Sequence, residues 1–336
     1  MVFGAARRAP IRRKEQSVSM LKALESVLAV LVMIGLGFFL ARRGRIGAEA
    51  ASLLSRLVVS IALPAYMVAN LMSGYDRAKI IAMLPGLPVP FLVMLAGFAL
   101  GQLIAAAARI PASRRGSFVS MFALSNTIFI GLPVNLVLFG DVSLPYVLLY
   151  YIANTTLFWT IGVYGIARDG AIRSGGPAPR VLSKDSLRRV LSPPLVAFLV
   201  TTVLIMAGLR LPDFLLGIAR TVGNMTTPLS MIFIGITIAA IDWKSARPGM
   251  DAVLLLVGRF VISPLLLVLA VKWSDLPSLM KRVFLIQASM PAMTQSSIVA
   301  RAYGADAEYA GLLTSITTVA SLVTIPLYMA LIGQLF

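Results

Sequence analysis

The stretch that decides the fold runs Ala-Leu-Ser-Asn-Thr-Ile-Phe-Ile-Gly-Leu-Pro-Val-Asn, residues 123–135, in the middle of a long apolar run. About 20 consecutive apolar residues are enough for a helix to cross a membrane. Here, however, polar side chains, a glycine and a proline interrupt the run, and each weakens a helix or brings polar atoms into hydrocarbon. Irregular backbone at membrane depth is tolerated only where protein or a water-filled cavity surrounds it. The stretch therefore predicts a broken helix inside a membrane protein.

The composition agrees with a membrane protein. Of the 336 residues, 59% are hydrophobic and 13% are charged, whereas about 25% of the residues of a soluble domain are charged. The net charge of +17 would fit a nucleic-acid-binding protein, but most of the Lys and Arg residues lie at the ends of apolar runs, as in membrane proteins. We therefore expect the lipid bilayer as a partner and no nucleic acid.

The chain has no cysteine and no histidine. Disulfides, thiol chemistry, the usual proton shuttle and the commonest metal ligand are thus excluded. We expect no metal site and no cofactor. The sequence also has no Gly-rich ATP-binding loop, and it offers few groups for catalysis, so we do not expect an enzyme.

The expected fold is an all-α polytopic membrane protein with ten transmembrane helices. The predicted spans are residues 21–40, 51–72, 83–107, 117–139, 144–167, 190–208, 213–240, 250–271, 280–301 and 307–334. The longest break, 168–189, contains glycine, proline and mixed charges, which is typical of a connector. It divides the chain into two sets of five helices, 20–167 and 190–336.

The charges of the loops predict the orientation. Lys and Arg are more frequent in the loops on the side of the connector than in those on the other side. The positive-inside rule then places the connector in the cytoplasm and both termini outside, in an inner (plasma) membrane. The basic tail 1–19 opposes this orientation. It does not have the pattern of a signal peptide, and we interpret it as an over-long start before Met20 or as a dispensable arm.

The two halves show signs of an internal repeat. One shift of the sequence places Arg56 and Pro64 on Arg220 and Pro228, and the same shift places Tyr164 on Tyr328. Because each half has five spans, an odd number, the second half must enter the membrane from the opposite side. This arrangement is the inverted repeat of many secondary transporters. The alternative is a chance alignment of apolar spans.

A second interrupted span lies at the matching place in the second half. Residues 285–297 combine Pro291 with Gln, Ser and Thr, as 123–135 combine Pro133 and Gly131 with Ser, Asn and Thr. Proline frees the carbonyl four residues earlier, and the positive N-terminal end of a half-helix attracts anions. We therefore predict that the two broken helices cross mid-membrane and bind a substrate there. The alternative is that these residues only kink and pack the helices. Pro64 and Pro228 are interpreted mainly as kinks, with a place along the substrate path as the alternative.

The motifs resemble those of the auxin efflux carrier family of transporters, over the chain from about Met20 to the end. The residues that carry the resemblance are Leu54–Pro64, Ser125-Asn-Thr with Gly131-Leu-Pro133, Ser192-Pro-Pro194, Met290-Pro291 and Ala300–Gly304. Where the family has a Pro-Asn pair in the fourth span, this chain has Ser125-Asn126, so only the Asn is retained and less helix breaking is forced there.

The resemblance implies two inverted five-helix repeats, similar to bile-acid–sodium symporters. It implies a scaffold domain made of the first two spans of each half, and a transport domain made of the other six spans that moves like an elevator. It also implies a homodimer with the spans 51–72 and 213–240 near the interface.

Several polar residues are candidates for the site. The expected substrate-binding residues are Ser125, Asn126, Thr127, Asn154, Pro291, Gln295 and Ser296. The expected helix breaks are Pro64, Gly131, Pro133, Pro228 and Pro291. Arg259 lies inside a span, where a charge is costly unless it is paired or wet. It either balances a substrate carboxylate or locks the transport domain, or it snorkels to the interface or binds helix-end carbonyls.

Together these features predict a secondary carrier that exports small organic anions, such as carboxylates or auxin-like acids. Asp and Glu lie near the ends of the predicted spans, whereas proton relays and sodium sites usually need a carboxylate inside the membrane. We therefore expect transport without sodium or proton coupling. The alternatives are a sodium- or proton-coupled symporter of the same fold and a membrane sensor that does not transport.

Overall fold

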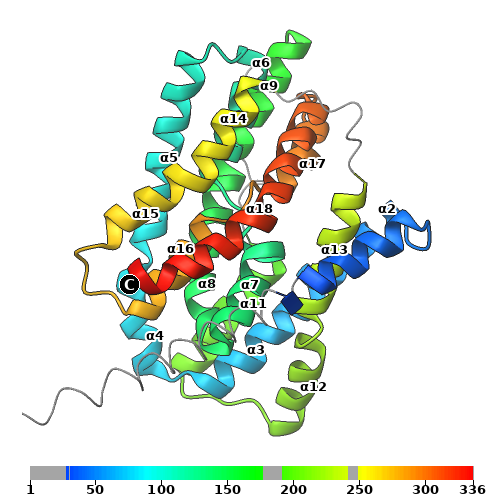
Figure 1. Cartoon of the computed structure of the whole chain (residues 1–336). Coiled ribbons are helices and arrows are strands. Elements are labelled where there is room, and N and C mark those ends of the chain that lie inside the picture. Colours follow the sequence, from blue (N-terminus) through cyan, green and yellow to red (C-terminus); the bar gives the residue numbers. More distant parts are fainter. Residues whose placement is uncertain (1–27, 30, 177–190, 241–248, 336) are drawn as a thin grey trace, which may run out of the picture.

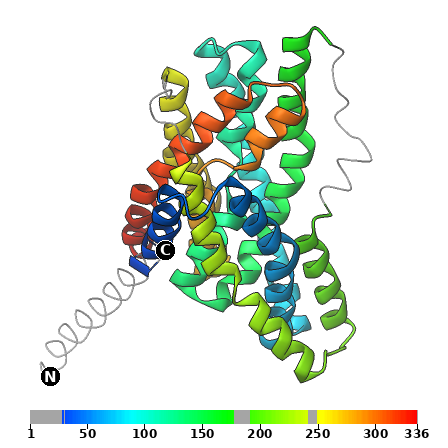
Figure 2. The ribbon, with the colours of Figure 1, turned by 90° about the vertical axis from the view of Figure 1, so that its right-hand side faces the viewer.

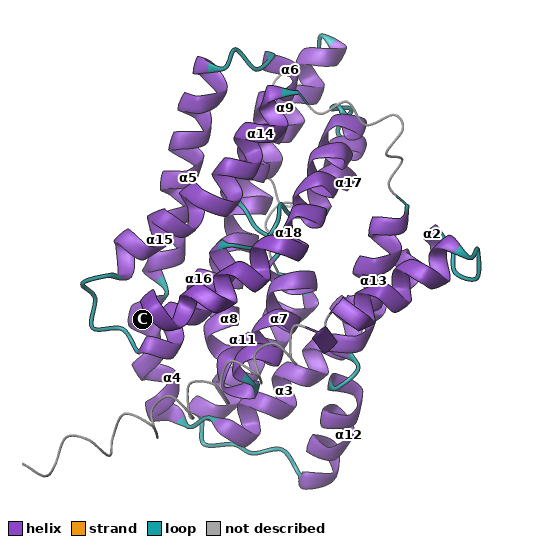
Figure 3. Ribbon diagram, in the orientation of Figure 1, coloured by secondary structure: helices purple, strands orange, loops and turns teal. Residues whose placement is uncertain are grey.

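The computed structural model describes residues 28–29, 31–176, 191–240 and 249–335, and this part of the chain forms helices and no strand (Figures 1 and 3). The predicted basic tail 1–19, most of the predicted connector and the loop 241–248 lie outside the described residues.

The apolar runs of the sequence form long helices. Six continuous helical segments are long and apolar enough to cross a membrane: Glu49–Gly74, Arg77–Ala107, Asp141–Ser174, Asp213–Ala239, Met250–Val271 and Ala307–Ile332. Shorter apolar helices are Leu31–Arg42, Thr127–Phe139 and Pro193–Met206. The chain is thus an all-helical, multi-pass membrane protein.

Apart from Leu31–Arg42, the described part of the first half contains eight α-helices, with short π and 3₁₀ turns between them. They are α2 (Ala48–Leu57), η1 (Val58–Ala62), α3 (Leu63–Gly74), α4 (Arg77–Met83), η2 (Leu84–Gly86), α5 (Pro88–Ala107), α6 (Ala112–Ala123), η3 (Thr127–Gly131), α7 (Leu132–Phe139), η4 (Asp141–Ser143), α8 (Leu144–Leu157), η5 (Phe158–Gly162) and α9 (Val163–Ser174).

The ninth helix of this half is Leu31–Arg42, which precedes α2 in the chain.

The second half has the same kind of elements. They are α11 (Pro193–Met206), α12 (Asp213–Gly223), α13 (Thr226–Ala239), α14 (Met250–Val257), η6 (Gly258–Ile262), α15 (Ser263–Val271), α16 (Ser278–Ala288), α17 (Gln295–Ala302) and α18 (Ala307–Leu335).

Two of the predicted spans are broken in the middle. The helix α6 ends at Ala123, and the next helix begins at Thr127, so the backbone of 124–126 is not α-helical. Likewise α16 ends at Ala288 and α17 begins at Gln295. The sequence suggested that Gly131 and Pro133 contribute to the first break, but the break lies before both residues. Pro133 instead lies in the first turn of α7, where its missing N–H costs no hydrogen bond.

The other prolines of the predicted breaks lie in helical segments that continue past them. Pro64, Pro133 and Pro264 each follow a five-residue π-helical turn closely. A proline ring clashes with the carbonyl four residues earlier in an α-helix, and the wider π turn relieves this clash. The segment Glu49–Gly74 therefore continues through Pro64. Pro228 lies in the first turn of α13, just after the junction with α12.

One boundary differs from the sequence prediction. The segment that begins at Asp141 stays helical to Ser174, although the predicted span ended at 167. Its left-handed C-cap is Gly175, a residue type that adopts this conformation without strain. The residues 168–174 of the predicted connector are thus part of the helix.

The helices form two sets (Figures 1 and 2). In the first set, α3 packs on α11 and α12, and α2 packs on α13. In the second set, α6 packs on α5 and α9, α5 on α8 and α15, and α17 on α18. Figure 1 shows that α5, α6, α9 and α14 extend upward beyond α2 and α13. The sets meet where α13 contacts η3 and α7.

A glycine pair lets α6 and α9 approach closely. A Cβ atom on Gly116 would lie 2.0 Å from the carbonyl oxygen of Gly165. This distance is too short for any residue with a side chain, so only glycine fits here. Next to this contact, the backbone N–H groups of Gly116 and Ser117 donate to the carboxylate of Asp169, at 2.8 and 2.6 Å. The buried Asp169 therefore binds the first turns of α6 to α9.

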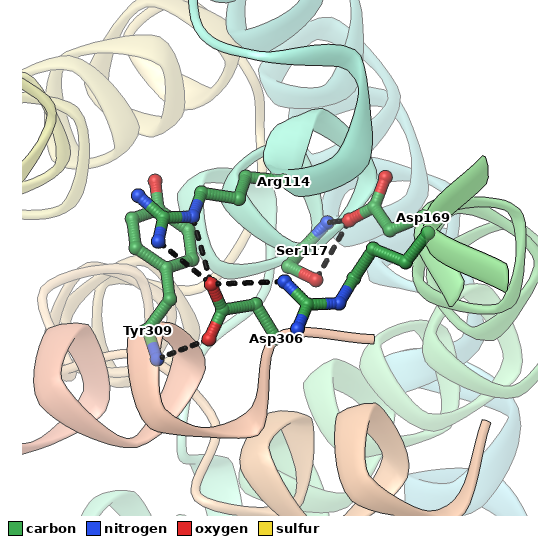
Figure 4. A network of polar contacts seen from close by, with 6 residues as sticks. Arg114, Ser117, Asp169, Asp306 and Tyr309 are labelled. Atoms are coloured by element: carbon green, nitrogen blue, oxygen red, sulfur yellow. Dashed lines mark hydrogen bonds and ion pairs between the residues drawn. The ribbon is translucent and has the colours of Figure 1, made fainter. Parts of the chain in front are cut away.

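A second carboxylate binds α18 to the same end of the bundle (Figure 4). Asp306 forms ion pairs with Arg114, at 2.7 Å, and with Arg173, at 3.4 Å, and it accepts a hydrogen bond from the N–H of Tyr309 at 3.1 Å. Burial alone would raise the pKa of Asp306, but these hydrogen bonds and the two positive charges outweigh burial and hold the pKa below its ordinary value. The ionised form of Asp306 thus stabilises the fold.

We predict that Asp306→Asn lowers the free energy of unfolding at pH 7 by about 1 kcal/mol, because ion pairs near the surface contribute up to about this much. A depressed pKa gives stability that is present above the unfolded-state pKa and is lost as the pH falls through the folded-state pKa. The difference from the parent protein should therefore shrink below about pH 4. Thermal unfolding of purified protein between pH 3 and 7 measures this. Glu308→Gln removes the same charge at an exposed position in the first turn of α18 and is the control. An unchanged difference at pH 3 would contradict the role of the ionised carboxylate.

Candidate substrate site at the helix crossing

The two helix breaks lie against each other. The N–H of Asn126 donates to the carbonyl oxygen of Pro291 at 2.9 Å, and Ser125 and Ala292 form an isolated antiparallel β-bridge. All four residues are buried. The extended segments therefore satisfy part of their backbone hydrogen bonding with each other, as irregular backbone inside a membrane requires.

Side chains from two further helices supply the other partners. Asn154 on α8 accepts a hydrogen bond from the N–H of Ser125 and donates one to its carbonyl oxygen, both at 3.0 Å. On α18, the hydroxyl of Thr317 accepts from the N–H of Ala292 at 3.2 Å. Each extended segment is thus held by hydrogen bonds from one side chain of a neighbouring helix.

Arg259 binds the C-terminal ends of both interrupted helices. This fully buried side chain donates to the carbonyl oxygens of Ala288, at 2.9 Å, and Met290, at 2.8 Å, at the end of α16. It also donates to the carbonyl oxygen of Phe122, at 3.1 Å, at the end of α6. The last carbonyls of a helix lack intrahelical partners. The sequence left several roles open for Arg259. The hydrogen bonds of its side chain correspond to one of them, the binding of helix-end carbonyls.

The N-terminal ends of the half-helices lie at a cavity. Asn126 caps the helix that begins at Thr127, because its side-chain oxygen accepts from the N–H of Phe129 at 3.2 Å. The side-chain Nδ2 of Asn126 is buried and has no hydrogen-bond partner. On the other side, Thr294 and Gln295 begin α17, and the Oε1 atom of Gln295 also has no partner.

This cavity has a volume of about 290 Å³. Its wall combines polar groups of the crossing with aromatic side chains of α8 and η5 and with residues of η1 and the start of α11. The lining residues are Val59, Asn126, Thr127, Ile128, Phe129, Tyr151, Thr155, Trp159, Leu191, Ser192, Pro193, Met293, Thr294 and Gln295. The volume is at the lower end of the range for small-molecule sites.

The predicted site residues separate into two groups. Asn126, Thr127 and Gln295 line the cavity. Ser125, Asn154, Pro291 and Ser296 are not among its lining residues. The first three of these take part in the backbone contacts of the crossing, and Ser296 is fully buried in α17. Asn154, expected to bind substrate, thus lies behind the crossing and holds it in place.

Other lining residues were not expected from the sequence. Tyr151, Thr155 and Trp159 are four residues apart and so share one face of a helix. This spacing could have indicated a common surface. Ser192, which begins a motif shared with the resembled family, shares a hydrogen bond of 2.7 Å with the hydroxyl of Tyr151. Gln287 was also missed: its side chain donates to the carbonyl oxygen of Thr127 at 3.3 Å.

Comparison with known proteins identifies the family. Residues 22–329 match the family described as membrane transport protein. The chain belongs to this family. It is the auxin efflux carrier family that the sequence motifs resemble, and the match covers both helix breaks and the cavity.

The chain is similar to archaeal members of the family along nearly their whole length. It is 29% identical over 316 residues to an uncharacterized transporter of Methanothermobacter thermautotrophicus, covering 90% of this chain and 96% of the relative. It is 25% identical over 313 residues to an uncharacterized transporter of Methanocaldococcus jannaschii, covering 91% of this chain and 97% of the relative. These relatives support membrane transport as the activity.

We predict that Asn154→Ala destabilises the protein strongly. The substitution leaves the N–H and the carbonyl group of Ser125 without these partners, and each unsatisfied buried group costs about 1–3 kcal/mol. Thermal unfolding in detergent measures the effect. Asn224→Ala, at an exposed position at the end of α12, is the control and should unfold like the parent protein. Equal melting temperatures for the two variants would show that Asn154 does not support the crossing.

Proposed function

We propose that this membrane transporter is a secondary carrier that exports small organic anions through the cavity at the helix crossing. The observation that supports this best is the buried Nδ2 donor of Asn126, which has no protein partner and lines the cavity. Burying a polar group without a partner is costly, so a ligand that accepts a hydrogen bond there gains free energy. The starts of two half-helices add partial positive charge to the same wall.

The remaining wall suits a substrate with an apolar body. Phe129, Tyr151, Trp159 and Met293 line the cavity together with the polar groups. Aromatic side chains pack well against planar rings. Carboxylates with a small aromatic or aliphatic body, including auxin-like acids, therefore fit the chemistry of the site.

The position of the cavity supports an elevator-type mechanism. Residues of the crossing and of α8 line the cavity together with Val59 of η1 and Pro193 of α11. A second cavity, of about 710 Å³, is lined by residues of α3, α12, η4 and the start of α16. In this proposal, spans 1, 2, 6 and 7 form a scaffold, and the other six form a transport domain within a ten-helix inverted repeat. Movement of that domain would expose the crossing to either side.

The charges at the cavity support uncoupled transport. Its lining residues in the described part of the chain include no carboxylate, whereas sodium and proton sites inside membranes usually contain one. An inside-negative potential then drives the anion outward, with about 2.3 kcal/mol per charge for each 100 mV. The proposal places the segment between α9 and α11 in the cytoplasm, and it includes a homodimer through the spans that contain α2–α3 and α12–α13.

Counterflow in proteoliposomes tests the proposal. Purified protein is reconstituted with an unlabelled carboxylate inside, and uptake of the same labelled compound is measured for phenylacetate, indole-3-acetate and malate. We expect uptake above that of protein-free liposomes for at least one of them. Uptake that requires a sodium or proton gradient would contradict uncoupled transport, and no uptake of any of them would contradict the proposed substrate class.

We predict that Asn126→Asp lowers this uptake at least tenfold. The new carboxylate keeps the oxygen that caps the helix at Phe129, but it replaces the unpartnered donor by an oxygen that repels an anion. Ser174→Asp adds the same negative charge at an exposed position at the end of α9, away from the cavity, and should leave uptake unchanged. Equal uptake by the Asn126 variant and the parent protein would show that the anion binds elsewhere.

A further inference from the structure

Arg259 has no carboxylate partner among the described residues. Its hydrogen bonds go to the carbonyl oxygens of Phe122, Ala288 and Met290, and to the hydroxyl of Ser263 at 3.5 Å. Arginine stays protonated inside proteins. The centre of the second set of helices thus holds a full positive charge whose hydrogen bonds, among the described residues, go to backbone carbonyls and a hydroxyl.

At the crossing, the negative and the positive ends of the half-helices lie in different surroundings. The end of a helix carries about half an elementary charge, negative at the C-terminus and positive at the N-terminus. The two C-terminal ends, α6 and α16, both meet the guanidinium of Arg259, and together their partial charges amount to about −1. The arginine therefore balances them. The two N-terminal ends, at Thr127 and Gln295, contribute about +1 and lie at the cavity.

The other charged groups of this set lie away from the crossing. Arg114, Asp169 and Asp306 lie close together in one polar network (Figure 4), and Arg173 pairs with Asp306. The side chains of Arg114 and Arg173 are 44% and 47% exposed to solvent. Charges that stay near the membrane surface cross little of the potential. Arg259 is therefore the described charge of this set that lies deepest beside the crossing.

From this arrangement we infer that Arg259 sets the charge state of the transport domain: the empty domain carries one positive charge across the membrane, and the domain loaded with a monoanion is neutral. This inference rests on the proposed function. It assigns the voltage-dependent step to the return of the empty domain, which an inside-negative potential drives from the outside to the inside. It also makes the site selective for monoanions over dianions.

Two flux measurements on the parent protein separate these steps. Exchange of a labelled monocarboxylate for the unlabelled compound uses only the loaded domain, whereas net efflux also requires the empty domain to return. The probe is phenylacetate, or indole-3-acetate if its counterflow is faster. An imposed inside-negative potential of 100 mV should accelerate net efflux several-fold, with about fiftyfold as the limit for a charge that crosses the whole field. It should leave exchange unchanged.

The variants Arg259→Gln and Arg259→Lys test the residue itself. The Lys variant retains the charge and should keep the pattern of the parent protein. In the Gln variant the empty domain is neutral and the loaded domain is negative, so exchange should become sensitive to the potential. Homophthalate, which adds a second carboxylate to phenylacetate, should compete at least tenfold more weakly than phenylacetate in the parent protein. If the Gln variant does not fold, the measurements on the parent protein decide.

The possible failures are distinguishable. Exchange by the parent protein that changes with the potential as strongly as net efflux does, or equal competition by homophthalate, would overturn the inference while carrier activity stands. If none of the carboxylates is exchanged, the proposed function fails, and the inference fails with it.

Discussion

The structure depends on one constraint: backbone hydrogen-bonding groups inside a membrane must find partners within the protein. The chain breaks two helices at mid-bundle, and each break exposes N–H and carbonyl groups that a continuous helix would satisfy. The bond between Asn126 and Pro291 pairs the breaks with each other. Asn154, Thr317 and Arg259 supply further partners from α8, α18 and η6. Removing any of these contacts leaves polar groups unsatisfied in a dry interior.

The same contacts orient the ends of the half-helices at the crossing. The C-terminal ends of the half-helices meet a buried arginine, and the N-terminal ends meet a cavity. Positive partial charge thus faces the space where a ligand fits, and negative partial charge is balanced inside the protein. This division is the basis of the proposal that the cavity, whose described lining residues include no basic side chain, binds an anion. It also explains why a single arginine remains in an otherwise apolar span.

The sequence predicted an all-helical, multi-pass membrane protein, and the described residues confirm this, because long apolar runs leave a membrane protein few alternatives. The ten-helix inverted repeat stays a prediction. The sequence also identified the two interrupted segments, since polar residues and Pro291 mark them plainly. It was less informative about where the first break lies. Pro133 suggested a contribution that the structure does not show, because a proline in the first turn of a helix costs no hydrogen bond.

The individual site residues were harder to predict, because a sequence does not tell which face of a buried helix points to a cavity. Asn154 was expected at the substrate and lies behind the crossing, whereas Tyr151 and Thr155 on the same helix line the cavity. Arg259 had several possible roles until the carbonyls of two distant segments were located around it.

The central claim is that the two breaks touch, and a disulfide between them tests it most directly, because the chain has no cysteine of its own. Directly opposed residues of an antiparallel pair have Cα atoms about 4.5–5.5 Å apart, within the range that a disulfide spans. Ser125→Cys combined with Ala292→Cys should therefore form an intramolecular disulfide on mild oxidation in membranes, detected by peptide mass spectrometry. Ser125→Cys combined with Asn224→Cys should not. Absence of the first disulfide under conditions that oxidise both thiols by other routes would contradict the crossing and the account of the site built on it.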